Sequence, residues 1–129
     1  MATKKNSTAP SFTTIDCRVA GVTFDERQKT IASMRSFGRR HDNCDWVSLE
    51  RDRHSAHDPN AVKVVYHAGD VHSVIGYVPR KFSARVARVM DEHKKGEPKR
   101  VWVGEHTVSR GKSGIYGMGI EIMMADETR

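Results

Sequence analysis

The sequence predicts a mainly β fold with one or two helices, in the form of a small, partly closed barrel of about six strands. First, about six short segments alternate apolar and polar residues, the period of two expected of half-buried strands. Second, two stretches carry apolar residues at helical spacing, next to Asp, Pro or Gly residues that suit helix ends. Third, a chain of 129 residues with 37% hydrophobic residues suits one modest core.

The N-terminal part is expected to hold a tail, a strand and a helix. Residues 1–13 are rich in Lys, Ser, Thr and Ala, which predicts a disordered tail. Apolar alternation over residues 15–24 predicts a strand, with a bulge or a close approach at Gly21. Asp25 can cap a helix that ends before Gly38.

Three strands are expected in the middle of the chain. A strand over residues 46–52 follows a polar stretch, and β-branched residues over 61–67 predict the next one. The Ala-Gly-Asp sequence at 68–70 is typical of a hairpin loop, so residues 71–78 form the return strand.

A basic amphipathic helix is predicted over residues 80–93. Pro79 suits its start, because proline lacks the N–H group that a first helical turn leaves unpaired. An apolar stripe packs the helix, and it consists of Phe82, Val86, Val89 and Met90. A neighbouring basic face consists of Lys81, Arg85 and Arg88.

The C-terminal part is expected to form a hairpin. A strand begins at Val101, a flexible basic loop follows at 109–114, and residues 116–124 alternate along a last strand. We therefore predict one domain over residues 14–125 and a short tail at 126–129.

The cysteines and tryptophans are expected to be structural. Cys17 and Cys44 lack CxxC spacing, which favours free thiols, and Cys17 sits in an apolar alternation that predicts burial. Trp46 and Trp102 lie beside valines, so we expect them in the core.

The positive charge is concentrated in one region. The formal net charge is +6, and residues 80–112 alone hold 10 Lys/Arg against 4 Asp/Glu. This excess follows the Gly-Tyr-Val-Pro segment and is typical of a phosphate-binding surface, although a solvated basic face has the same composition. No apolar run reaches the roughly 20 residues of a membrane span, and the start lacks an apolar signal region. We expect a soluble, cytoplasmic monomer.

Four segments together resemble the HIRAN domain, and the resemblance covers roughly residues 15–124. The segments are Val19-Ala20-Gly21-Val22, Leu49-Glu50-Arg51, His57-Asp58-Pro59-Asn60-Ala61-Val62-Lys63-Val64 and Ile75-Gly76-Tyr77-Val78-Pro79-Arg80. That family occurs at the N-terminus of SNF2-class helicases and as stand-alone bacterial or phage proteins. The resemblance implies a barrel related to OB and SH3-like folds that binds single-stranded DNA and grips its 3′-hydroxyl end.

The resemblance also implies roles for individual residues. Asp58 would accept a hydrogen bond from the terminal hydroxyl, and its charge would repel a terminal phosphate. From the residues alone, Asp58 and Asn60 can equally brace their own turn. Tyr77 and Arg80 match positions that face the DNA, although Tyr77 can also be an ordinary half-buried strand residue.

Several ligand-facing positions depart from the family pattern. The family often has a basic residue and then an aromatic one where Thr23 and Phe24 stand, an asparagine at Ser55 and an aromatic residue at His57. Phe24 can stack on a base or pack in the core, and His57 can stack on a base and hydrogen-bond to it. The expected DNA-binding residues are Phe24, His57, Asp58, Asn60, Tyr77, Arg80, Lys81, Arg85 and Lys112.

The function that the sequence favours is a non-enzymatic DNA-binding module that acts with a partner helicase or nuclease in repair, replication or fork processing. The sequence contains residues of the types that bind metals, namely His41, Asp42, Cys44, His54, His57 and Asp58. They form no HExxH or paired CxxC motif, which disfavours a metal-dependent nuclease and predicts neither a metal nor another cofactor. A peptide-binding adaptor on the same barrel is the alternative.

Overall fold

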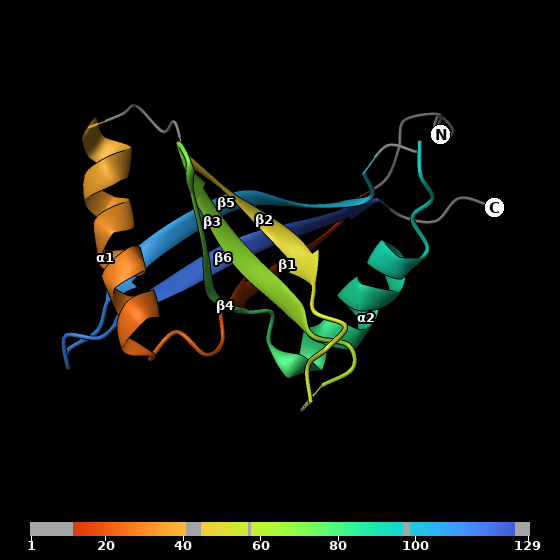
Figure 1. Ribbon diagram of the computed structural model, residues 1–129, viewed down its shortest axis with the longest axis horizontal. Coiled ribbons are helices and arrows are strands. Elements are labelled where there is room, and N and C mark those ends of the chain that lie inside the picture. The colour runs from red at the N-terminus through yellow and green to blue at the C-terminus, as the bar shows by residue number, and fades with distance from the viewer. Residues whose placement is uncertain (1–11, 41–44, 57, 97–98, 126–129) are drawn as a thin grey trace, which may run out of the picture.

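The computed structural model describes residues 12–40, 45–56, 58–96 and 99–125, and of residues 35–40 it describes only the helical backbone. This part of the chain is mainly β with two helices, as the sequence predicts (Figure 1). Phe12 and Thr13, which we expected in the N-terminal tail, open the first strand instead. The elements are β1 Phe12–Arg18, α1 Asp25–Arg40, β2 Asp45–Arg51, β3 Val62–Ala68, β4 Val71–Tyr77, α2 Arg80–Asp91, β5 Val101–Arg110 and β6 Tyr116–Ala125.

The strands form two antiparallel sheets of three. One has the order β1-β6-β5 and the other the order β2-β3-β4. In the first sheet Ile15 pairs with Ile122, and in the second Val47 pairs with Tyr66, so apolar residues share the inner faces. β1, β5, β2 and β4 are therefore the edge strands.

A backbone bridge connects the two sheets just before the second helix. The Ala20 N–H donates to the Tyr77 carbonyl at 2.8 Å, and the Tyr77 N–H donates to the Ala20 carbonyl at 2.9 Å. Gly76 lies against this bridge, where a Cβ atom would overlap the Ala20 carbonyl oxygen and the Val19 side chain. The described strands pair as two separate sheets and form no closed barrel, so the closure remains a prediction.

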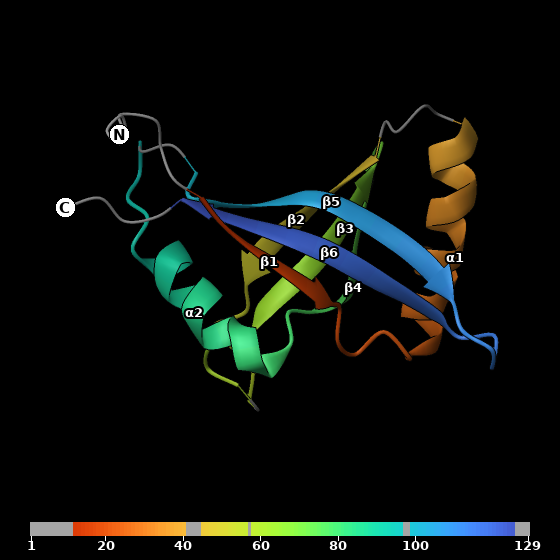
Figure 2. The ribbon, with the colours of Figure 1, turned by 180° about the vertical axis from the view of Figure 1, so that it is seen from behind.

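The core lies between the sheets and is sealed by the helices at opposite sides of the molecule (Figures 1 and 2). α1 contributes Ile31 and Met34, and α2 contributes Val86 and Ala87. β6 buries every second residue, namely Met118, Ile120, Ile122 and Met124, as its alternation predicts. The two helices thus close the core, and both also carry residues that are exposed to solvent.

Several other element boundaries differ from the prediction, among them the ends of β1, α1 and α2. β1 ends at Arg18 because the chain turns at Gly21, whose φ is +72°, and does not continue as a strand to Phe24. α1 runs through Gly38 to Arg40, since one glycine costs a helix only about 1 kcal/mol. α2 ends at Asp91, two residues before the expected end.

The prediction that both tryptophans lie in the core is wrong, since the core contains neither Trp46 nor Trp102. Trp46 is 53% exposed, because it points to the outer face of β2 while Val47 points inward. Trp102 is half-buried and packs edge-on against Phe12, with ring centroids 5.3 Å apart. Cys17 is a half-buried free thiol, and burial raises its pKa. Cys44 lies outside the described residues.

Trp46 covers a buried histidine whose protonation should destabilise the fold. Its ring stacks on His67 at 3.9 Å, and the two ring nitrogens of His67 lie 2.7 Å from Ser48 Oγ and 2.6 Å from His72 Nδ1. Burial lowers the pKa of His67, and the charge of His72 lowers it further. Below about pH 6.5 the unfolded chain therefore binds more protons than the folded chain, and stability falls as the pH falls.

We expect the free energy of unfolding to decrease between about pH 7.5 and pH 5.5, and to decrease less in His67→Phe, which keeps the aromatic stack. Urea unfolding followed by tryptophan fluorescence measures this difference. His54→Gln, in an exposed loop, is the control and should keep the wild-type pH dependence. An identical pH dependence in His67→Phe and the wild type would contradict the prediction.

Candidate nucleic-acid interface

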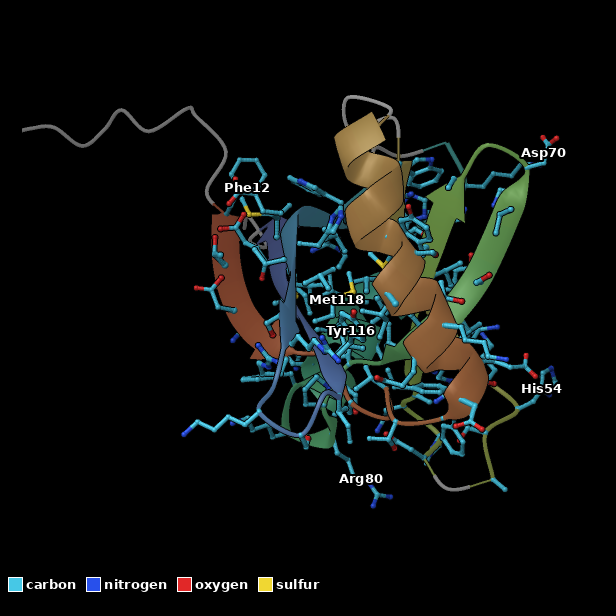
Figure 3. All side chains as sticks on the ribbon, turned by 90° about the vertical axis from the view of Figure 1, so that its left-hand side faces the viewer. Phe12, His54, Asp70, Arg80, Tyr116 and Met118 are labelled. Atoms are coloured by element: carbon cyan, nitrogen blue, oxygen red, sulfur yellow. The ribbon has the colours of Figure 1, made fainter. Side chains whose placement is uncertain are left out.

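Three segments meet below the two sheets, where β4 passes into α2. They are the turn before α1, the loop between β2 and β3, and the start of α2. Figure 3 shows Arg80 projecting from the bottom of the molecule and His54 projecting from its side, level with the first turn of α1. The expected DNA-binding residues of these segments therefore lie on one side of the fold.

An arginine lies between two aromatic rings in this region. Phe24 is 64% exposed, which excludes the core alternative for this residue. The Arg27 guanidinium carbon lies 4.5 Å from the Phe24 ring centroid and 5.5 Å from that of Tyr77. Arg27 Nη1 also donates to the Gly21 carbonyl at 2.7 Å, which fixes the guanidinium. The arrangement combines aromatic rings, which can stack on a base, with a guanidinium between them, which can attract the phosphate of the same nucleotide.

Arg27 was not among the predicted residues. The family pattern has its cation directly before Phe24, where Thr23 supplies none, whereas Arg27 lies one helical turn further along the chain. Because Asp25 starts α1, a residue three positions after Phe24 returns to the same side of the chain. The spacing of three residues between Phe24 and Arg27 could therefore have indicated that their side chains lie together.

Tyr77 is held at the back of this cluster. Its hydroxyl donates to Asp52 Oδ2 at 3.1 Å, and the residue is half-buried. Burial raises the pKa of the phenol, and the hydrogen bond to Asp52 raises it further, so the ring stays neutral at physiological pH. Because the Tyr77 hydroxyl is bound to Asp52, Tyr77 contributes its aromatic ring to the cluster.

The loop between β2 and β3 is braced by one arginine. Arg51 donates to the Ala61 carbonyl at 2.7 Å, to the Pro59 carbonyl at 3.1 Å and to Asp91 Oδ1 at 2.9 Å. The Arg51 hydrogen bond lowers the pKa of Asp91, at the end of α2. The loop therefore has a fixed position relative to that helix.

Asp58 is seen in the bracing role that the sequence left open. Its Oδ1 accepts the Asn60 N–H at 2.9 Å, and its Oδ2 lies 3.1 Å from the hydroxyl of Ser83, which is buried in α2. Each carboxylate oxygen has a second lone pair, so the group can still accept a hydrogen bond from a ligand. Binding of a terminal hydroxyl by Asp58 remains a prediction.

The other predicted residues are spread more widely. Asn60, Arg80 and Lys81 are exposed around the start of α2, and Lys81 Nζ lies 5.1 Å from the Phe82 ring. Arg85 lines a separate pocket further along α2, and Lys112 lies in the turn between β5 and β6. His57 lies outside the described residues.

A hollow of ≈ 790 Å³ opens beside Phe24 and Arg27. It continues past Asp25 and Glu26 to Ser73 on β4. The two carboxylates disfavour a phosphate there, so the hollow suits an uncharged part of a ligand, such as a base.

Of the candidate metal ligands, the structure describes only His54 and Asp58. Among all the described residues, no group of three or more His, Cys, Asp or Glu side chains is placed to hold a metal ion. The candidates His41, Asp42, Cys44 and His57 lie outside the described residues. Likewise, no helix within the described ranges is long and apolar enough to cross a membrane.

Comparison with known proteins gave two matches. The family model of the HIRAN domain matches residues 17–109. A curated relative, the Fanconi-associated nuclease 1 homolog of Oryza sativa subsp. japonica, is 36% identical over 47 residues, which make up 36% of this chain and 5% of the relative. No solved structure matched the chain.

Proposed function

This chain belongs to the HIRAN domain family, a family of DNA-binding domains, and we propose that it binds the 3′-hydroxyl end of single-stranded DNA. The observation that carries the proposal is the cluster that the exposed Phe24 forms with the half-buried Arg27 and Tyr77. Exposed aromatic rings stack on unpaired bases of any sequence, whereas a base inside a duplex offers no free face. The central guanidinium adds attraction for the backbone phosphate.

Selection of the 3′ end is assigned to Asp58. Its Oδ2 lies 3.1 Å from Ser83 Oγ, which in turn lies 3.2 Å from the Arg80 carbonyl oxygen, so the carboxylate lies at the first turn of α2. A terminal hydroxyl can donate to a carboxylate, whereas a terminal phosphate is repelled by it. Asn60 and Lys81 flank the same helix start and complete the proposed end-binding surface.

A partner enzyme would supply the chemistry. The Oryza sativa relative is named as a nuclease, and the match covers 5% of its length. We propose that this domain positions a helicase or nuclease at DNA ends during repair, replication or fork processing. The domain itself acts by binding.

A salt titration tests the binding itself. We expect the affinity for a fluorescent single-stranded oligonucleotide to fall linearly on a logarithmic plot against salt, with a slope of about 0.7 for each phosphate neutralised. Fluorescence anisotropy at several salt concentrations measures the slope. Absence of binding at low salt would contradict the proposal, and salt-insensitive binding to a peptide would support the adaptor alternative.

A further inference from the structure

We propose that the groove between α2 and the outer edge of β1 binds the sugar-phosphate backbone on the 5′ side of the bound 3′ end. This inference rests on the proposed function, and it adds the route that the DNA strand takes away from its bound 3′ end. Figure 2 shows α2 running beside β1, with its C-terminal end towards the start of that strand. β1 pairs only with β6 among the named strands, so its other edge is the one on the side of α2.

One wall of the groove is a row of positive charges. Lys81, Arg85 and Arg88 follow one another at spacings of four and three residues, which places them on one face of α2. All three are exposed, because α2 packs on the core through its opposite face, where Ser83, Val86 and Ala87 are buried. The row covers about 10 Å along the helix axis.

The row leans towards β1. Lys81 lies over the Phe82 ring, and its charge acts on Cys17 of β1, where it opposes the upward shift of the thiol pKa that burial causes. Further along, Arg85 and Arg88 line the same pocket as Thr13 of β1. Basic residues of α2 therefore act on Cys17, near the end of β1, and share a pocket with Thr13, near its start.

The far end of the groove is a basic pocket of ≈ 140 Å³. Arg85 and Arg88 line it from α2, and Arg100 lines it from the segment before β5. Among the described residues that line the pocket, Glu92 is the one carboxylate, and its Oε1 lies 3.7 Å from Arg100 Nη1. Three guanidinium groups against one carboxylate among these residues give an excess of positive charge, which favours an anion such as a phosphodiester group.

Direction and length follow from the position of the proposed end site. The proposed end site lies at the start of α2, at Asp58 and Arg80. A DNA strand whose 3′ end is bound there would continue along the groove towards its 5′ end. From Arg80 to Arg88 the helix rises about 12 Å, a length that suits about two to four nucleotides. The groove thus extends the footprint from the terminal nucleotide to the pocket at Arg100.

The test uses oligonucleotides with a 3′-hydroxyl, of about two and about eight nucleotides, in anisotropy titrations of the full chain. Arg88→Gln should weaken binding of the longer oligonucleotide about threefold to tenfold and lower its salt slope by about 0.7, while binding of the dinucleotide is unchanged. Glu92→Gln should strengthen binding of the longer one, because it removes the carboxylate beside Arg100. Lys29→Gln, an exposed charge on α1 at the other side of the molecule, is the matched control.

A backbone-modified probe separates phosphate contacts from base contacts. A longer oligonucleotide with neutral methylphosphonate linkages on the 5′ side of its last two nucleotides should bind only as well as the dinucleotide. Equal affinity of this probe and the natural strand, or Arg88→Gln and Glu92→Gln behaving like Lys29→Gln, would overturn the groove while end binding stands. Absence of binding by every oligonucleotide would overturn both the groove and the proposed function.

Discussion

Gly76→Ala is expected to destabilise the fold by at least about 3 kcal/mol, a large fraction of the stability of a domain of this size. A Cβ atom at Gly76 would overlap the Ala20 carbonyl oxygen and the Val19 side chain. The Ala20 oxygen is part of the bridge to Tyr77, so it cannot move without breaking the backbone hydrogen bonds that connect the two sheets. A clash with backbone is relieved less easily than one with a flexible side chain.

Urea unfolding at neutral pH measures this loss. Gly111→Ala is the matched control, because a Cβ atom there meets its nearest neighbour, the Ile115 carbonyl oxygen, at an ordinary 3.5 Å. We expect the control to stay within about 1 kcal/mol of the wild type. A Gly76→Ala variant as stable as the control would show that the contact between Gly76 and Ala20 does not constrain the fold.

Loss of the Phe24 ring should weaken binding of single-stranded DNA by about tenfold to a hundredfold, since stacking of one base on an aromatic ring contributes about 1–3 kcal/mol. Phe24 is 64% exposed, so Phe24→Ala should leave the stability almost unchanged. Arg27→Lys keeps the charge but loses the planar group over the two rings, and it should give a smaller loss of the same kind.

Anisotropy titrations of the variants, combined with their unfolding curves, measure both effects. Phe24→Tyr keeps an aromatic face and should bind nearly as the wild type does, whereas Val71→Ala removes an exposed apolar group from the β3–β4 hairpin and should have no effect. Wild-type affinity in Phe24→Ala would remove the aromatic cluster from the binding surface.

The features predicted correctly from the sequence depend on local patterns. β6 was predicted from its alternation and α2 from its apolar stripe and Pro79, and both are confirmed. These signals work because burial on one face of a strand or helix recurs at a fixed period along the chain. The burial of Ser83 in α2 was not predicted, because serine is not part of the apolar stripe. Its side chain is buried and donates a hydrogen bond to Asp58.

The features that the sequence did not predict depend on contacts between distant segments. Trp46 is exposed because the pairing of β2 with β3 fixes which face of β2 turns inward, and an isolated strand does not show this. Arg27 meets Tyr77 because the bridge between Ala20 and Tyr77 brings the start of α1 to the end of β4. The bond between Asp58 and Ser83 likewise joins residues that are 25 positions apart.

The central claim is that this domain recognises the 3′-hydroxyl end of a DNA single strand. It is tested most directly by titration with two oligonucleotides of the same sequence, one ending in a 3′-hydroxyl and the other in a 3′-phosphate. We predict that the hydroxyl end binds at least about tenfold more tightly, and that Asp58→Asn, whose amide oxygen can still accept the Asn60 N–H, reduces this preference. Equal affinity of the wild-type domain for the two ends would contradict the claim.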